Sequence, residues 1–296
     1  MTTTRPERIA PRTAAAATVA PAPAGRRKSR FSPFFWAATF WLVLVVLLAI
    51  FADLLPIPAY DETVGPPRQL PQLSWDALLG TDAVGRSVLS RLITGARVSL
   101  VVGLLAVSIA VIIGALLGLA AAYFRGWIEA VIAVITDAML AFPALILLMA
   151  IAAAMTPSLA TLTISLGLLG IPGFIRLTKA NALQALGQEY IVAARAMGAR
   201  TARIMFREVL PNAVIPLLAF ALLVIALLMV AEGSLSFLGL GVPVPFPSWG
   251  GMIAAGRADM ALVPGLVLIP AAVLFLTVFS LNTVGDGLRK VLALRG

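Results

Sequence analysis

The chain of 296 residues contains no cysteine and no histidine. These absences exclude a Ser-His pair, a cysteine nucleophile, an HExxH zinc site, a haem histidine ligand and a disulfide bond. The sequence also contains no GxxxxGK[ST] loop of the kind that cradles nucleotide phosphates. We therefore predict no catalytic residue, no metal ligand and no cofactor-binding residue in this chain.

Charged residues are scarce as well, at 12 % of the chain, while 61 % of the residues are hydrophobic. A soluble domain has about 25 % charged residues and roughly 45–50 % apolar ones. Because so little polar surface is available to face water, the composition predicts a polytopic membrane protein.

Six apolar runs are long enough to cross about 30 Å of hydrocarbon as α-helices. They are residues 34–52, 98–124, 130–155, 159–175, 213–231 and 262–284. We therefore predict an all-α fold with six transmembrane helices, whose core comprises residues 98–284.

Residues 1–33 are rich in Ala, Thr, Pro and Arg and are expected to form a disordered tail. A basic cluster at 26–30 precedes the first apolar run, as in a secretory signal peptide. That run has about 20 residues, whereas the apolar region of a signal peptide has 7–15. An uncleaved anchor at 34–52 is therefore favoured over a signal peptide.

The distribution of basic residues predicts the orientation. If the N-terminus is cytoplasmic, external segments hold few of the 22 Lys and Arg residues, namely Arg68, Arg86, Arg91, Arg97 and Arg257. The positive-inside rule then places both termini in the cytoplasm, with an external loop at 53–97 containing an amphipathic segment and a cytoplasmic C-terminus at 285–296. The net charge of +9 reflects this topology rather than nucleic-acid binding.

Small residues recur at every fourth position of the second run, at Ala106, Ala110, Gly114, Gly118 and Ala122. Such a row allows another helix backbone to approach closely. The sequence leaves open whether that helix belongs to this chain or to another subunit.

The cytoplasmic segment 186–211 carries the most informative pattern. Ala193, Ala194 and Met197 share a small apolar helix face that could enter a groove of a partner protein or lie on lipid headgroups. Gly198 is predicted to end this helix and Thr201 to cap a second one. Pro211 is predicted to begin the next membrane helix.

Ala193-Ala194, then Gly198 and later Leu210-Pro211, resemble the EAA loop of ABC importer permeases, with Val192 at the motif's acidic position and Glu189 one turn upstream. In that family the loop forms short coupling helices that dock into a groove of the ATPase. The resemblance implies that the residues coupling this chain to an ATPase are Glu189, Ala193, Ala194, Arg195, Met197, Gly198, Leu210 and Pro211.

Three further stretches are similar to the dipeptide, oligopeptide and nickel group of these permeases. They are LGTDAVGRSVLSR at 79–91 with GARVSL at 95–100, LSFLGLG at 235–241 with SWG at 248–250, and GDGLR at 285–289. The resemblance implies a C-type permease with the MetI-like fold of a type I ABC importer. Its cargo would be dipeptides or oligopeptides, and the alternative cargo is nickel or another small ligand. A remote alternative for the function is a carrier that does not depend on ATP.

The same resemblance implies the partners and the location. A second permease subunit would form a heterodimer with this chain, and one or two ATPase subunits, or a fused ATPase, would bind ATP and Mg²⁺. An extracytoplasmic substrate-binding protein would deliver the cargo. The chain would be a multi-pass protein of the bacterial inner membrane, in contact with the lipid bilayer and with no nucleic acid.

Asp137 is the only acidic residue inside a predicted span. It is a candidate for lining or gating the translocation path, but its nearness to the cytoplasmic side favours a structural pair with Arg125 or Arg176. An aspartyl protease built from Asp137 and Asp286 is disfavoured, because Asp286 lies in the charged C-terminal ending.

Three other residues are candidates for the path or its gate. Phe142 and Pro143 are expected to kink the third helix, because proline lacks the N–H that a helix interior requires. Glu232 is expected at the outer end of the fifth helix, before a glycine-rich stretch at 233–241 that we predict to be re-entrant or irregular. It is placed there either to contact substrate or as a solvated helix end.

Overall fold

The computed structural model describes the backbone of residues 32–293 and the side chains of residues 32–290. Except for its last two residues, the predicted tail at 1–33 lies outside the described residues. The first helix begins at Pro33, where the Ser32 hydroxyl accepts a hydrogen bond of 3.3 Å from the Phe34 N–H.

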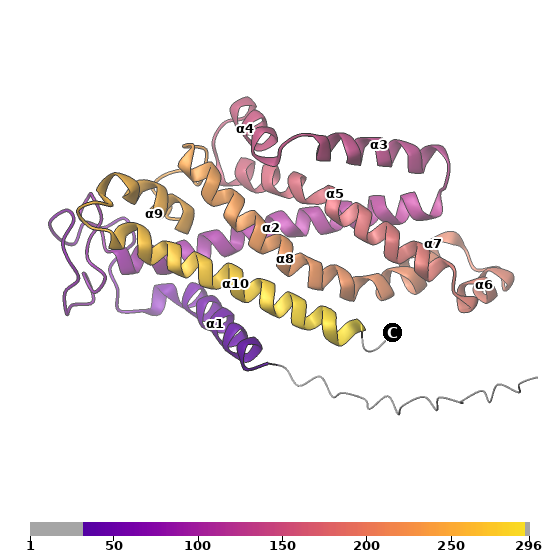
Figure 1. Cartoon of the computed structure of the whole chain (residues 1–296), viewed down its shortest axis with the longest axis horizontal. Helices are drawn as coiled ribbons and strands as arrows, with labels where there is room; N and C mark the ends of the chain where they lie inside the picture. Colours follow the sequence, from indigo (N-terminus) through magenta and orange to yellow (C-terminus); the bar gives the residue numbers. More distant parts are fainter. Residues whose placement is uncertain (1–31, 294–296) are drawn as a thin grey trace, which may run out of the picture. The chain divides into compact units, whose positions relative to one another are not determined.

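Most of the described part of the chain is helical, and residues 32–293 contain no β-strand (Figure 1). They are α1 (Pro33–Ile50), α2 (Val88–Tyr123), α3 (Trp127–Ala141), α4 (Ala144–Ala154), α5 (Leu159–Leu186), α6 (Glu189–Ala196), α7 (Thr201–Arg203), α8 (Leu210–Phe237), α9 (Trp249–Gly256) and α10 (Gly265–Ala293). A π-helical segment, Ile204–Val209, joins α7 to α8. The predicted all-α fold is confirmed.

Five helical stretches are long and apolar enough to cross a membrane: α1, α2, α5, the run Thr201–Phe237 and α10. The pair α3 and α4 passes the same test together and is bent by 94°. The bend falls at Phe142 and Pro143, where a kink was predicted. The described residues therefore contain the six predicted spans if the bent pair counts as one.

The helices extend beyond the predicted apolar runs. Helix α2 begins at Val88 rather than at residue 98, and α5 continues past residue 175 to Leu186. Hydropathy marks the stretch that suits hydrocarbon, whereas a helix continues into water until its backbone hydrogen bonds are interrupted or capped. At the start of α2 the Ser87 hydroxyl accepts from the Ser90 N–H at 3.4 Å.

The row of small residues on α2 packs against α5 of the same chain. A Cβ placed on Gly118 would lie 2.7 Å from the Ile175 carbonyl oxygen and 2.7 Å from the Thr178 Cβ. Ala106 and Ala110 are fully buried on the same face. Because a larger side chain would separate the two backbones, the row serves internal packing, which was one of the two readings of the sequence.

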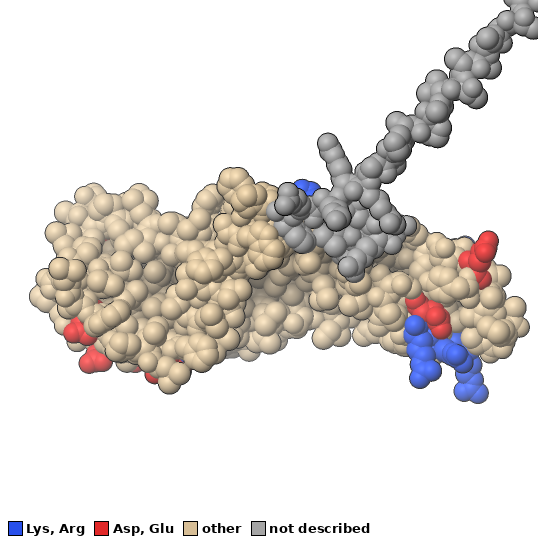
Figure 2. Space-filling model, turned by 90° about the horizontal axis from the view of Figure 1, so that it is seen from below, with Lys and Arg blue, Asp and Glu red and all other residues tan. Residues whose placement is uncertain are grey.

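Charged side chains gather at the two ends of the helical bundle. On the face shown in Figure 2, red atoms lie at the end where α9 is found in Figure 1, and blue and red atoms lie at the α6 end. The surface between them is tan, apart from blue atoms at the edge of the grey region. This uncharged band is what a bilayer-spanning chain requires.

Candidate functional site

Helix α6 ends in a defined backbone motif. Gly198 has φ +79°, the Gly198 N–H donates to the Arg195 carbonyl at 2.9 Å, and the Ala199 N–H donates to the Ala194 carbonyl at 3.0 Å. These two bonds and the left-handed glycine form a Schellman cap. The predicted helix break at Gly198 is confirmed, and it turns the chain sharply from α6 toward α7.

A separate hydrophobic cluster holds this connection against the ends of α2 and α5. It contains Leu119, Ala122, Ala182, Ala185, Ile191, Ile204, Met205 and Val209. Ile191 from α6 and Val209 from the π segment are fully buried in it. The segment between α5 and α8 is therefore a packed structure and not a flexible loop.

Tyr123, the last residue of α2, adds polar contacts to this packing. Its hydroxyl lies 2.7 Å from the hydroxyl of Thr201, and the Arg195 guanidinium carbon lies 5.7 Å from the centre of its ring. On the other side, the Asn212 side-chain amide donates to the Tyr190 hydroxyl at 3.1 Å. Sequence reasoning missed both tyrosines, because no local pattern links residues so far apart along the chain.

One prediction about this connection is wrong: Arg200, not Thr201, is the N-cap of α7, and it makes no side-chain capping bond. The prediction that Pro211 starts the next membrane helix is confirmed, because α8 begins at Leu210 and holds Pro211 in its first turn. Helical structure nevertheless runs on from Thr201 through this point to Phe237. The π segment precedes Pro211, with the Leu210 N–H bonded to the Met205 carbonyl, which is how a helix can adjust its hydrogen bonding near a proline.

One face of α6 is apolar and uncovered among residues 32–290. Met197 is 82 % exposed, Val192 is 61 % exposed and Ala193 is also exposed. The predicted face of Ala193, Ala194 and Met197 is thus largely outward, although Ala194 is half-buried. An exposed apolar patch on a rigid element is typical of a surface that binds another protein.

The remaining residues of the predicted coupling set lie around this face. Glu189 is exposed in the first turn of α6, and Arg195 is exposed above Tyr123. Leu210 is half-buried against the hydrophobic cluster, and Pro211 lies in the first turn of α8. The structure brings these residues to one end of the bundle (Figure 1).

Asp137 forms an ion pair with Arg176, with 2.7 Å between the carboxylate Oδ1 and Nη2. The favoured structural pair is thereby confirmed, and its partner is Arg176 rather than Arg125. Both side chains are more than half exposed. Phe142 and Pro143, at the bend between α3 and α4, are exposed too.

Of the two alternatives predicted for Glu232, substrate contact or a solvated helix end, the solvated helix end is wrong. Helix α8 continues through Gly233 to Phe237, and Glu232 is only 3 % exposed. Its Oε1 accepts hydrogen bonds of 2.8 Å from the hydroxyls of Ser236 and Ser248. The stretch at 233–241, predicted to be re-entrant or irregular, is helical as far as Phe237. The two serine hydroxyls supply hydrogen bonds to the buried carboxylate.

Ser248 is also the N-cap of α9, and its hydroxyl accepts a hydrogen bond from the Gly251 N–H at 3.0 Å. A Cβ on Gly250 would lie 2.8 Å from Glu232 Oε2, so only glycine allows α9 to approach α8 this closely. Trp249 fixes α9 to α2, since its indole N–H donates to the Leu92 carbonyl at 2.9 Å. Glu232 thus anchors the start of α9.

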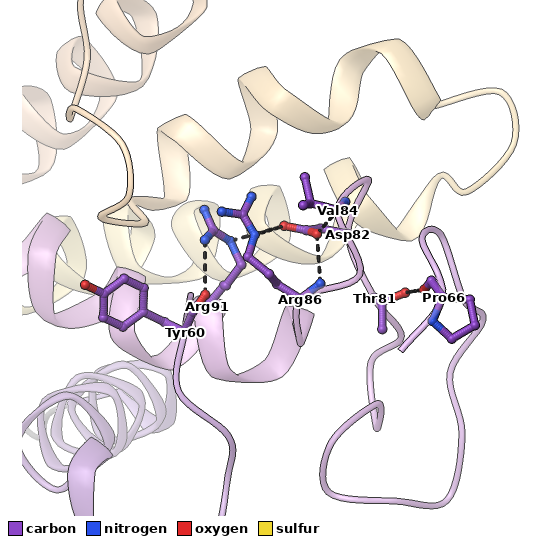
Figure 3. A network of polar contacts seen from close by, with 7 residues as sticks. All are labelled: Tyr60, Pro66, Thr81, Asp82, Val84, Arg86 and Arg91. Atoms are coloured by element: carbon purple, nitrogen blue, oxygen red, sulfur yellow. Dashed lines mark hydrogen bonds and ion pairs between the residues drawn. The ribbon is translucent and has the colours of Figure 1, made fainter. Parts of the chain in front are cut away.

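Polar contacts near the start of α2 converge on Asp82 (Figure 3). Its Oδ2 lies 2.8 Å from Arg86 Nε and 3.6 Å from Arg91 Nε. Arg91 Nη1 donates to the Tyr60 carbonyl at 3.2 Å, which ties the loop after α1 to α2. The two guanidinium groups lie side by side next to a single carboxylate.

The chain is similar to known membrane transport proteins. Residues 110–295 match the family described as binding-protein-dependent transport system inner membrane component. The dipeptide transport system permease protein DppC of Alkalihalophilus pseudofirmus is 40 % identical over 247 residues, covering 83 % of this chain and 81 % of the relative. The glutathione transport system permease protein GsiD of Pectobacterium atrosepticum is 36 % identical, covering 86 % and 85 %.

A di/tripeptide transport system permease protein DppC of Pseudomonas aeruginosa is 39 % identical, covering 85 % of each chain. Among solved structures, a chain of the MetNI methionine ABC transporter in an inward-facing conformation superimposes with a TM-score of 0.56. It shares 19 % identity and covers 68 % of this chain and 96 % of its own length. That similarity supports the predicted fold.

Proposed function

The chain belongs to the family of binding-protein-dependent transport system inner membrane components, and on that premise we propose that it is a permease subunit of an ATP-driven importer of dipeptides or oligopeptides. Relatives at 36–40 % identity are named for dipeptide, di/tripeptide and glutathione transport. Glutathione is itself a small peptide, so these names agree on the chemical class of cargo.

The observation that carries the proposal is the rigidly held, uncovered apolar face of α6. Met197 and Val192 are exposed there, while Ile191 on the opposite face is fully buried. The chain contains no GxxxxGK[ST] nucleotide-binding loop, so energy from ATP would have to come through a partner, and this face is where an ATPase would dock. The ATPase, and not this chain, would bind ATP and Mg²⁺.

The orientation follows from the charges. The α6 end carries Arg195, Arg200, Arg203 and Arg207, and we place it in the cytoplasm together with both termini. The opposite end, with α9 and the loop 51–87, would then face the substrate-binding protein. The exposed apolar sides of the bundle would contact lipid and the second permease subunit.

Transmission of force follows from the packing around α6. Because Ile191, Ile204 and Val209 share one buried cluster with α2 and α5, movement of α6 by the ATPase must also move these long helices. The bent pair α3 and α4, with Phe142 and Pro143 exposed at its corner, would line the path between the two permease subunits. Asp137, held by Arg176, would border that path near its cytoplasmic end.

Uptake of radiolabelled dialanine by cells with and without this chain tests the proposal. We expect uptake that depends on the chain and on ATP, and that unlabelled di- and tripeptides suppress but nickel ions do not. Uptake that persists after ATP depletion while a proton gradient remains would contradict the proposed function. Suppression by nickel alone would instead favour a nickel permease.

A further inference from the structure

A cavity of about 340 Å³ opens at the α9 end of the bundle. It lies between the start of α2, the chain that follows α8, and α9. Its polar lining comes from Arg86, Arg91, Arg257, Ser236 and Ser248. None of the residues in this lining belongs to the candidate coupling segment at the other end of the bundle.

Every charged side chain in the lining of this cavity is an arginine. Asp82 lies beside it and is shared by Arg86 and Arg91, so one carboxylate serves two guanidinium groups (Figure 3). Arg257 has no ion-pair partner among residues 32–290. Asp259, nearby, is already paired with Arg68 at 2.7 Å.

Glu232 lies behind the wall of the cavity, where the hydroxyls of Ser236 and Ser248 bond to it. Asp82, Asp61 and Glu232 lie near these arginines but outside the lining, so the charged groups that line the cavity are all positive. The Arg91 side chain is only 10 % exposed, so part of this charge is shielded from water. A desolvated guanidinium group interacts strongly with a carboxylate, often through two parallel hydrogen bonds.

The rest of the cavity wall is apolar. Phe237, Val242, Val244, Phe246 and Pro247 line it, and the Phe246 ring stacks on Tyr60 with 6.2 Å between ring centres. A basic end beside an apolar wall suits a small molecule that carries a carboxylate and an apolar group. A peptide with a free C-terminus has both features.

We propose that this cavity binds the free carboxylate of a small peptide, through Arg257 and the guanidinium groups of Arg86 and Arg91. This inference rests on the proposed peptide cargo, and it adds a binding site on the permease itself at the end where the cargo would arrive. The apolar wall would hold the neighbouring side chain of the peptide.

The lack of native cysteine makes the charge of the cavity measurable. Ala255 lines the cavity and is exposed, so Ala255→Cys introduces one thiol there. We would compare its rates of modification by a negatively charged methanethiosulfonate reagent and by a positively charged one, in the assembled transporter reconstituted in nanodiscs. We expect the negative reagent to react faster, relative to the rates at a Leu73→Cys thiol outside the cavity.

Removing one positive charge from the cavity should lower the ratio of the modification rate by the negative reagent to that by the positive reagent. Arg257→Gln, added to Ala255→Cys, is expected to lower the negative-to-positive rate ratio about threefold or more, as Coulomb's law gives for a unit charge several ångströms away in water. Arg257→Lys should keep the ratio. Arg97→Gln, which removes an arginine at the same end that does not line the cavity, should change it little.

Peptide protection tests the ligand. With the substrate-binding protein omitted, we expect millimolar dialanine to slow modification of Ala255→Cys, and dialanine with an amidated C-terminus to have no effect. Equal protection by the two peptides, or protection only when the binding protein is present, would overturn the proposal. The modification rate is measured on a thiol of this chain, independently of transport. If dialanine does not protect the thiol while ATP-driven dialanine uptake is intact, the cavity does not bind the peptide, but the proposed function still stands.

Discussion

The hydroxyl of Tyr123, at the end of α2, lies 2.7 Å from the hydroxyl of Thr201, at the start of α7 and 78 residues later. This contact connects α2, a helix of 36 residues, directly to the segment where an ATPase would dock. Together with the Arg195 guanidinium above the Tyr123 ring, it would add a polar connection to the apolar packing through which α2 is proposed to follow α6.

Tyr123→Phe removes this hydrogen bond while keeping the ring. A double-mutant cycle with Thr201→Val is expected to give a coupling free energy of about 1 kcal/mol, the usual net value of a hydrogen bond. Thermal unfolding of the purified protein measures it. Additive effects of the two substitutions would show that the contact contributes nothing to stability.

Met197→Asp places a carboxylate on the exposed face of α6. If an ATPase covers this face, the substitution leaves an unpaired charge in the interface and removes apolar contact, which together should weaken association at least about tenfold. The amount of ATPase recovered with the tagged chain measures the effect. Met260→Asp makes the same change at an exposed methionine of the opposite end and should leave recovery unchanged.

Gly198→Val tests whether the turn after α6 transmits force. A Cβ on Gly198 meets no atom within 4 Å, so the damage comes from the positive φ, at about 1–2 kcal/mol. We expect membrane insertion to persist and the amount of dialanine imported per ATP hydrolysed to fall severalfold. Gly126→Val is the matched control, because Gly126 has φ +87° and equally open surroundings.

Gly126 links α2 to α3 and lies outside the coupling segment, so its variant should keep the normal ratio of import to hydrolysis. If both variants import dialanine with unchanged stoichiometry, the turn at Gly198 has no role in coupling. If both lose coupling equally, backbone strain at this end explains the defect rather than the position of α6.

Glu232→Ala removes the acceptor of two hydroxyls, that of the buried Ser248 and that of the half-buried Ser236. Leaving buried donors without a partner costs about 1–3 kcal/mol, so the melting temperature should fall and α9 should become accessible to protease. Ser234→Ala is the control, since Ser234 bonds only to the Val230 carbonyl of its own helix. Equal melting temperatures for Glu232→Ala and wild type would show that this network does not hold α9.

The spans and the bend at Pro143 could be predicted because each depends on local properties, hydropathy and the missing N–H of proline. The Gly198 break is local in the same way. The burial of Glu232 could not be predicted, since its partner Ser248 belongs to a different helix. The roles of Tyr123 and Tyr190 depend likewise on which helices meet, and hydropathy contains no information about that.

The ends of the helices were predicted less well for another physical reason. Helix α2 starts ten residues before its apolar run because the Ser87 cap and the ion pairs of Arg91 and Arg97 support helix outside hydrocarbon. The row from Ala106 to Ala122 was visible in the sequence as a close-packing surface. Only the fold identifies α5 as the helix that fills it.

The most direct test of the central claim is purification of the tagged chain from its native membranes in mild detergent, with mass spectrometry and an ATPase assay on the eluate. The account predicts a second permease, an ABC ATPase and a substrate-binding protein recovered with the chain, together with ATP hydrolysis that dialanine and the binding protein stimulate. Recovery of a stable chain alone, without ATPase activity, would contradict it.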